Sequence, residues 1–307
     1  MSANDKKDDK VFRAADSSKI TRDFLDSLLI EMRHLDGVLP STRFELFGKT
    51  FDTPIMMAAF SHLDTFKIHE DGMVEIARAA AAANAVNFAG MGSEDELERI
   101  IETGAATVKI IKSYADNERI LRKIEHAESA GALAVGMDID HSFNRRGEYD
   151  NVLGDEMRPK TTDELKMFVK ATKLPFIVKG VLSVIDAVKC AEAGVQGIVV
   201  SHHHGIIDYA VPPLMILPEI VKAVGGKLKI FVDCGIDSGY DVFKALALGA
   251  DAACVGRAIL GPLSKGGADA ARNWLESETA VLAGIMARTG SATLQDIDAS
   301  LLHKKQF

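Results

Sequence analysis

Short apolar runs recur eight times along the chain, and an amphipathic segment lies between most of them. A run that is apolar on both faces is typical of a strand in a parallel sheet that helices cover on both sides. Eight such alternating units predict an α/β fold, a single closed (β/α)8 TIM barrel. The runs occupy residues 54–60, 85–90, 106–112, 132–140, 175–180, 197–203, 229–235 and 252–258.

A doubly wound sheet is the alternative architecture. The first strand of such a sheet is more often followed by a glycine-rich turn, whereas AAFSHLD follows the first predicted strand here. The segments EAGVQGIVV and ALGADAACVGR repeat one pattern of helix end, glycine, short turn and strand, which the barrel explains. The barrel is therefore favoured.

Two segments flank the predicted barrel. Residues 18–37 carry apolar residues at helical spacing and predict a helix that ends at Gly37. A short hairpin with its turn at Gly48 should follow, and residues 266–298 should form closing helices. We expect an N-terminal tail and helix over residues 1–40, and the barrel with its closing helices over residues 41–307.

Composition, net charge and cysteine positions limit the kinds of protein that this sequence can encode. The chain has 307 residues, of which 47% are hydrophobic, enough for a sizeable core, and its net charge of −8 leaves no basic footprint for nucleic acid. No apolar run reaches the roughly 18 residues that span a bilayer. The charged N-terminal segment lacks a signal-peptide core. The three cysteines, Cys190, Cys234 and Cys254, lie in apolar segments, which favours reduced thiols in a cytoplasmic protein.

Polar side chains gather where the predicted strands end. In a barrel these ends carry the catalytic residues, and packing alone gives no reason to place a lysine or an aspartate there. Six of the eight strands show the pattern, so the sequence predicts an enzyme. The residues concerned are Lys112, Asp138, Asp140, Lys179, His202, His203, His204, Asp233 and Arg257.

The three consecutive histidines of the segment SHHHG, His202 to His204, allow three interpretations. They could be packing residues, although one imidazole would then have to enter the core. One of them could be a general base that Asp140 orients. Alternatively, a divalent metal could bind Asp138, Asp140, His202 and His204, because residues two apart in an extended strand share a face. That site would belong to a flavin-free, metal-dependent lyase or isomerase.

A phosphate site is expected after the last strand. Gly256 and Arg257 lie there and open into a short helix. Barrels commonly bind phosphate at this position, where backbone N–H groups and the guanidinium would both donate hydrogen bonds.

The segment from residue 175 to residue 260 resembles the FMN-dependent α-hydroxy acid oxidase/dehydrogenase family, the glycolate oxidase and lactate oxidase-like enzymes. The motifs that carry the resemblance are VKG, EAGVQGIVVSHHHG, LPEIVKAVGG and DVFKALALGA. The likeness extends unevenly over most of residues 40–290. It implies an oxidoreductase with FMN as its cofactor, a small anionic substrate, and a homo-oligomer, commonly a tetramer.

Roles follow from the resemblance residue by residue. His203 matches the catalytic base, Asp140 matches the aspartate that pairs with that base, and Lys179 matches the lysine beside the flavin N1/O2 edge. The resemblance implies that Ser201, Asp233, Gly235, Gly256 and Arg257 bind the cofactor.

The chain also departs from the family pattern. Where the family places a substrate-binding arginine beside the base, this chain has Ile206 or Ile207, and Asp237 replaces an arginine near the phosphate. Two carboxylates, Asp138 and Asp237, therefore approach the expected flavin position. We expect a substrate other than the ordinary 2-hydroxy acids, such as a longer polyol acid. The expected substrate-binding residues are Lys112, Arg146, His202, His204 and Asp138.

Overall fold

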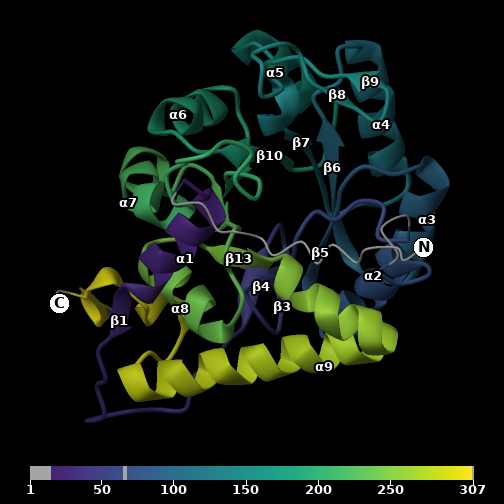
Figure 1. Ribbon diagram of the computed structural model, residues 1–307. Helices are drawn as coiled ribbons and strands as arrows, with labels where there is room; N and C mark the ends of the chain where they lie inside the picture. The colour runs from purple at the N-terminus through teal and green to yellow at the C-terminus, as the bar shows by residue number, and fades with distance from the viewer. Residues whose placement is uncertain (1–14, 65–67, 306–307) are drawn as a thin grey trace, which may run out of the picture.

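The computed structural model describes residues 15–64 and 68–305 and contains an eight-stranded parallel sheet. One parallel bridge, Phe60 to Ala89, joins its two edge strands, and the Gly90 N–H donates to the Phe60 carbonyl at 2.7 Å. The ring is thereby closed, which confirms the predicted barrel (Figure 1). The strands follow one another around the ring as β4 (Ile55–Met57), β13 (Ala252–Val255), β12 (Lys229–Val232), β11 (Gly197–Val200), β10 (Phe176–Val181), β7 (Ala134–Asp138), β6 (Ala106–Lys112) and β5 (Val86–Ala89).

Helices surround this ring because each amphipathic segment buries its apolar face on the strands. Side-chain caps fix where several of them begin: Ser93, Asp116, Thr161 and Ser183 each accept a backbone N–H bond from the first turn that follows. The helices are α2 (Gly72–Ala82), α3 (Glu94–Glu102), α4 (Asn117–Ser129), α5 (Thr162–Lys170), α6 (Val184–Glu192), α7 (Pro213–Val224), α8 (Gly239–Ala247) and α9 (Arg257–Thr289). The last of these is kinked at Gly266–Gly267, and its second part runs along the lower edge of Figure 1.

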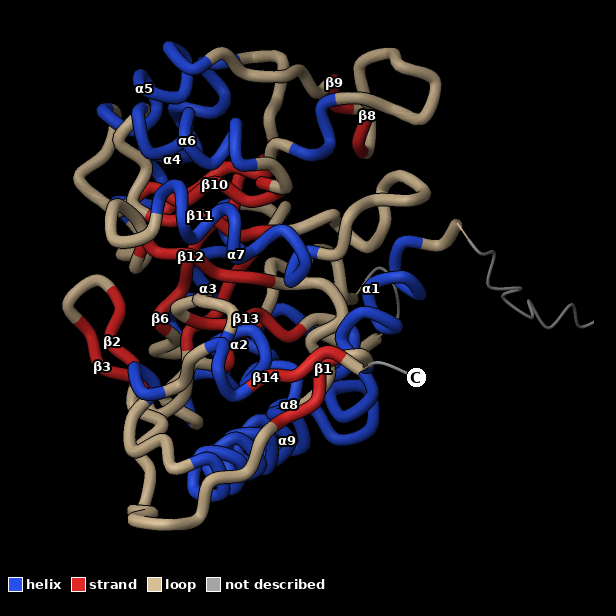
Figure 2. The backbone as a smooth tube through the Cα atoms, turned by 90° about the vertical axis from the view of Figure 1, so that its left-hand side faces the viewer, coloured by secondary structure: helices blue, strands red, loops and turns tan. Residues whose placement is uncertain are grey.

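The N-terminal segment differs from the sequence expectation. Helix α1 (Ser17–Asp26) ends eleven residues before Gly37, so the predicted helix over residues 18–37 is too long. The chain continues as β1 (Leu28–Ile30), which pairs antiparallel with β14 (Leu302–Lys304) near the other end of the chain. Figure 2 shows these two strands side by side. The backbone hydrogen bonds that β14 offers outweigh a local helical periodicity. Most of the predicted tail lies outside the described residues.

Two hairpins lie outside the barrel ring. The first, β2 (Phe44–Leu46) with β3 (Lys49–Phe51), confirms the turn at Gly48, where Phe47 and Gly48 both have positive φ (49° and 79°). The second, β8 (Asn151–Val152) with β9 (Asp155–Glu156), belongs to the loop that follows β7 and a single 3-10 turn, η1 (Asp140–Ser142). Two further 3-10 turns, η2 (Leu294–Asp296) and η3 (Ala299–Leu301), lead into β14.

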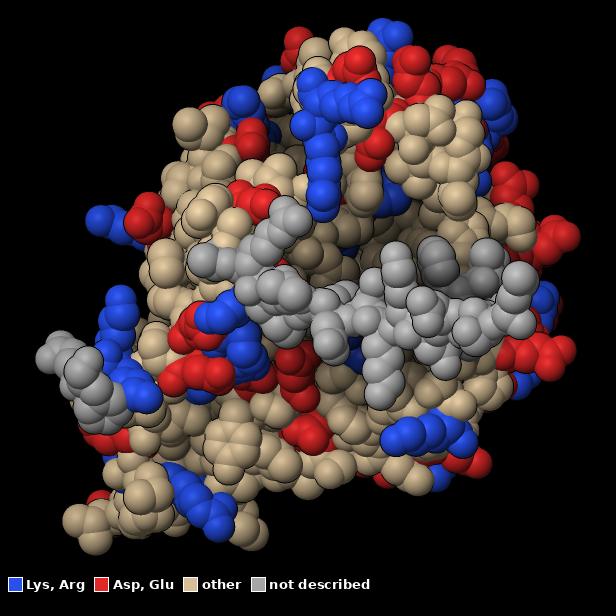
Figure 3. All heavy atoms as spheres, in the orientation of Figure 1, with Lys and Arg blue, Asp and Glu red and all other residues tan. Residues whose placement is uncertain are grey.

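The surface carries charges of both signs. On the face shown in Figure 3, Lys and Arg side chains lie among Asp and Glu side chains rather than in one basic patch. Among the helices of the described residues, none is both long and apolar enough to cross a membrane.

Candidate active site at the C-terminal ends of the strands

A buried lysine stands at the centre of the site. Lys179 lies on β10 just before a register shift, and its Nζ is 3.7 Å from Asp233 Oδ2 and 3.9 Å from Asp140 Oδ2. Burial alone would lower the pKa of Lys179, but the charges of Asp138, Asp233 and Asp140 outweigh burial and raise it. The lysine is therefore a cation held by carboxylates at the ends of β7 and β12.

The position after Lys179 requires a glycine, Gly180. Its φ is +91°, and a Cβ added there would lie 2.5 Å from Asp140 Oδ2. Any other residue would meet the carboxylate as well as the backbone strain of a positive φ. The glycine thus lets Asp140 approach β10 closely.

His203 faces Asp140. Its Nδ1 lies 2.7 Å from Asp140 Oδ1 and 3.5 Å from Asp138 Oδ2, and its backbone N–H donates to Ser201 Oγ at 3.1 Å. Burial and Lys179 lower the pKa of His203, yet the two carboxylates outweigh them and the pKa is raised. Burial, followed by the charge of Asp138, raises the pKa of Asp140 to about 6. The contact is close but poorly aligned as a hydrogen bond, and neither Asp140 oxygen has another hydrogen-bond donor among the described residues.

Lys112 forms a buried ion pair. Its Nζ lies 2.7 Å from Asp138 Oδ2, and the two residues are partners in the β6–β7 register. Burial would raise the pKa of Asp138, but Lys179, His203 and Lys112 together lower it well below its usual value. Both predicted substrate contacts, Lys112 and Asp138, are therefore occupied by one buried ion pair.

His202 also lies away from the expected position. Its ring is buried, Nδ1 accepts the Gly205 N–H at 2.9 Å, and Nε2 lies 2.7 Å from Thr21 Oγ1 on α1. With both nitrogens engaged, this imidazole has a structural role and offers no ligand atom. The predicted four-residue metal set, which required it, is not assembled.

Two further predicted substrate contacts lie at the edges of the site. His204 has a φ of +63° and lines the central cavity, and burial, followed by Arg257, lowers its pKa to about 4. Arg146 is exposed on the loop after β7 and does not line that cavity. The structure thus keeps His204 near the site and leaves Arg146 outside it.

A cavity of about 430 Å³ opens beside Lys179 and His203. This volume falls within the range of small-molecule and cofactor sites, roughly 300–1,000 Å³. Its apolar wall comes from residues 58–60, Leu63 and Ile68, and its other walls come from β10 and from the turns after β11, β12 and β13. Four of the cofactor-binding residues expected from the sequence line it: Asp233, Gly235, Gly256 and Arg257.

The far end of the cavity is suited to an anion. Arg257 is the first residue of α9, is exposed, and forms no ion pair with the described residues. Asp237 also lines this end, and burial, followed by Asp241, raises its pKa. A carboxyl group that ionises less readily repels an anion less, so this shift weakens the repulsion between Asp237 and a bound phosphate.

Sequence reasoning missed three residues near the site. His141 Nε2 lies 3.2 Å from His203 Nε2, and its Nδ1 lies 3.1 Å from Asp150 Oδ2. Cys234 lines the cavity at a φ of +68° and donates to Asp233 Oδ1 at 2.9 Å. His141 directly follows Asp140 in the sequence, and this adjacency is the signal that could have identified it as a site residue.

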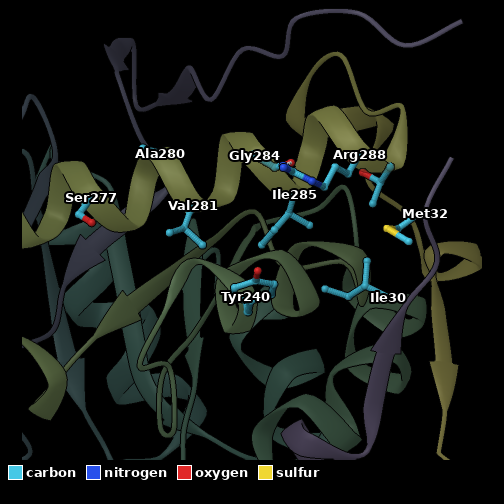
Figure 4. Close-up of a pocket in the computed structure, with 10 residues that line it drawn as sticks. Ile30, Met32, Tyr240, Ser277, Ala280, Val281, Gly284, Ile285 and Arg288 are labelled. Carbon is cyan, nitrogen blue, oxygen red and sulfur yellow. Dashed lines mark hydrogen bonds between the residues drawn. The ribbon is translucent and has the colours of Figure 1, made fainter. Parts of the chain in front are cut away.

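Another cavity, of about 670 Å³, lies far from this chemistry between α9, α8 and the β1 segment (Figure 4). Ile30, Val281 and Ile285 give it an apolar lining. Its cation, Arg288, donates to the carbonyl of Gly284. This cavity has no group suited to acid–base catalysis at neutral pH, so the smaller cavity is the candidate active site.

Comparison with known proteins identifies the family. Residues 13–164 and 147–304 match the model of the FMN-dependent dehydrogenases. The chain is 32% identical to 4-hydroxymandelate oxidase of Amycolatopsis orientalis, over 77% of this chain and 75% of that protein. It is 30% identical to an L-lactate oxidase of Nostoc, over 84% and 81% of the two chains. A solved mandelate oxidase variant with an FMN adduct superposes with a TM-score of 0.86 at 31% identity, covering 96% of this chain and 93% of the other.

The residues of the cavity fit this cofactor. Lys179 supplies a buried cation to its lining, and Arg257, at the N-terminus of α9, supplies a cation with no ion-pair partner among the described residues. Asp138, one of the two carboxylates that the sequence placed near the flavin, is paired with Lys112. The chain belongs to the FMN-dependent dehydrogenase family and is an FMN-dependent oxidoreductase with a TIM-barrel fold.

Proposed function

We propose that the protein oxidises the hydroxyl-bearing carbon of a 2-hydroxy acid or a closely related compound to a carbonyl. The observation that supports this most strongly is the His203–Asp140 pair, 2.7 Å apart beside a buried lysine at the cavity wall. FMN, when bound, accepts the two electrons of the oxidation. Relatives with this fold include an L-lactate oxidase and a 4-hydroxymandelate oxidase.

In this proposal the protein handles the proton and the charges. His203 accepts the hydroxyl proton, and Asp140 stabilises the imidazolium that results. Lys179 holds the electron-rich end of the cofactor, while Gly256 and Arg257 hold its phosphate. Ser201 fixes the backbone of His203, while Asp233 keeps Lys179 in place.

The substrate should be recognised without an arginine that binds its carboxylate through two hydrogen bonds. In the described part of the chain, the only arginine that lines the cavity is Arg257, at the end proposed for phosphate. His204 lies nearer to the base, but its lowered pKa makes it neutral at pH 7. A neutral imidazole donates one hydrogen bond where a guanidinium would donate two charged ones. We therefore propose that the ordinary 2-hydroxy acids bind weakly and that neutral amides of the same acids bind nearly as well.

Anaerobic mixing of the FMN-loaded protein with a substrate panel tests both parts. The panel contains glycolate, lactate, mandelate, longer polyol acids, and the amides of lactate and mandelate. Bleaching of the flavin band by any member supports the proposed oxidation, and failure of every member across pH 6–9 contradicts it. If an acid has a kcat/KM more than about 100-fold above that of its amide, an anion clamp exists and the specificity proposal is wrong.

A further inference from the structure

A second imidazole–carboxylate pair meets the catalytic one. His141 lies in η1, and its ring packs edge-on against the ring of His203, with centroids 4.3 Å apart at 87°. The two Nε2 atoms are 3.2 Å apart, while the two Nδ1 atoms point away toward Asp150 and Asp140. The arrangement therefore runs Asp140, His203, His141, Asp150 in one line of contacts.

The loop after β7 holds Asp150 firmly. The Asp150 N–H donates to the Ser142 carbonyl at 3.2 Å, and the Asp150 carbonyl accepts the Met157 N–H at 2.8 Å. Tyr149 stacks on Phe143, and Arg158 covers the Tyr149 ring. The hairpin of β8 and β9 is thus a support that fixes the carboxylate behind His141.

The contacts of the two rings determine where their protons lie. Lys179 Nζ can only donate, and it lies 3.3 Å from His203 Nδ1, so this nitrogen accepts and the neutral His203 ring carries its proton on Nε2. Asp150, at 3.1 Å, favours a proton on His141 Nδ1, which leaves a lone pair on His141 Nε2. The His203 Nε2–H therefore donates to His141 Nε2 at 3.2 Å. A proton that His203 takes up enters at Nδ1, and the Nε2 proton can then pass to His141.

The charges around the pair decide which ring holds that proton. His203 is faced by Asp138 and Asp140 from the end of β7, by Lys179 from β10 and by Asp233 from the end of β12. His141 is faced by Asp150 and, from further away, by Lys112 and Asp138. Burial, followed by Lys112 and His203, lowers the pKa of His141, whereas that of His203 is raised. A proton that His203 takes up therefore favours His203 over His141, and His141 is the neighbouring acceptor.

We propose that His141, oriented by Asp150, takes the catalytic proton from His203 and passes it to solvent. This inference rests on the proposed role of His203 as the base. The N–H bond at His203 Nε2 breaks as one forms at His141 Nε2, and the Nδ1 proton of His141 leaves through Asp150, so no electrons are transferred. The side chains of His141 and Asp150 are 24% and 22% exposed, so both reach water.

The first experiment uses His141→Leu in the FMN-loaded protein, with His126→Leu as the matched control. His126 is another imidazole paired with a carboxylate, 3.0 Å from Glu98 Oε1, but it lies on α4. Steady-state turnover is measured with the best substrate at increasing imidazole concentration. We expect turnover of His141→Leu to fall at least about tenfold and to recover with imidazole, while the wild type and the control stay independent of imidazole. Asp150→Asn should show the same dependence to a smaller extent.

The second experiment does not depend on activity. Histidine labelled with 13C at Cε1 reports the titration of each ring by NMR in the same proteins. Loss of the proton acceptor in His141→Leu should lower the His203 midpoint by about one pH unit, because a hydrogen bond to a charged group is lost. An unmoved His203 midpoint, or turnover of His141→Leu that is unaffected or independent of imidazole, overturns the inference.

The two experiments also separate this inference from the proposed function. A wild type that no member of the substrate panel reduces contradicts the function, and the NMR titration still decides whether the proton is shared. Normal flavin reduction together with an unmoved His203 titration leaves the function intact and removes the relay.

Discussion

Gly180→Ala should damage both the stability and the chemistry of the protein. The added Cβ would lie 2.5 Å from Asp140 Oδ2 and 2.8 Å from its Cγ, at a φ of +91°. The left-handed backbone costs about 1–2 kcal/mol for a residue with a Cβ. Displacing the packed carboxylate adds about 1–3 kcal/mol. We expect the free energy of unfolding to fall by about 2–5 kcal/mol, and urea titration measures it.

The same clash moves Asp140 away from His203, so catalysis should suffer as well. A displacement of about 1 Å at a catalytic contact costs on the order of 100-fold in rate. Gly131→Ala is the matched control, because Gly131 has a φ of +89° and nothing within 4 Å of an added Cβ. It should lose only the backbone contribution, about 1–2 kcal/mol, and reduce flavin normally. Equal stabilities and equal flavin reduction in the two variants would refute this explanation of the lysine–glycine pair.

The remaining predictions concern the base, the ion pair and the assembly. His203→Gln should stay yellow yet reduce flavin about 10²–10⁴-fold more slowly in stopped flow, and an unchanged rate would assign the base elsewhere. Because the pKa of His203 is raised and its protonated form accepts no proton, kcat/KM should rise with pH through a midpoint above 6.5; a midpoint below that value contradicts the assignment. Lys112→Met should cost about 3 kcal/mol in urea unfolding, since it removes the cation nearest to the buried Asp138 carboxylate and leaves it only Lys179 and His203; a raised KM without loss of stability would instead support its substrate role. We also expect a homo-oligomer, and light scattering that reports a 33.1 kDa particle would contradict it.

The sequence was sufficient to predict the barrel because the relevant signal is local and periodic. Each strand is apolar on both faces and each helix is amphipathic, so eight repeats specify the architecture without knowledge of distant contacts. The predicted helix over residues 18–37 was wrong because the structure of this segment depends on a distant contact. Its second half pairs with β14, and no local pattern reveals a partner so far along the chain.

The site was predicted in part. Which residues gather at the cavity follows from their place at the strand ends, but side-chain direction does not. The metal hypothesis assumed an extended strand through the histidines, whereas His203 and His204 have φ values of +45° and +63°. The chain therefore turns after His202, which sends that ring to α1 while His203 turns toward Asp140. The ion pair of Lys112 could not be predicted, because its register partner, Asp138, could not be known before the strands were aligned.

The pairing of β1 with β14 has a consequence for how the site is completed during synthesis. Helix α1, just before β1, carries Thr21, which contacts His202, and Arg22, which donates to the carbonyl of Gly235 at 3.2 Å. β1 is synthesised early, but it can form its pairing with β14 only after β14 has left the ribosome. Closing so long a loop is slow relative to forming neighbouring βα units. Until β1 is paired, contacts such as those of Thr21 and Arg22 must hold α1 against the wall beside the histidines.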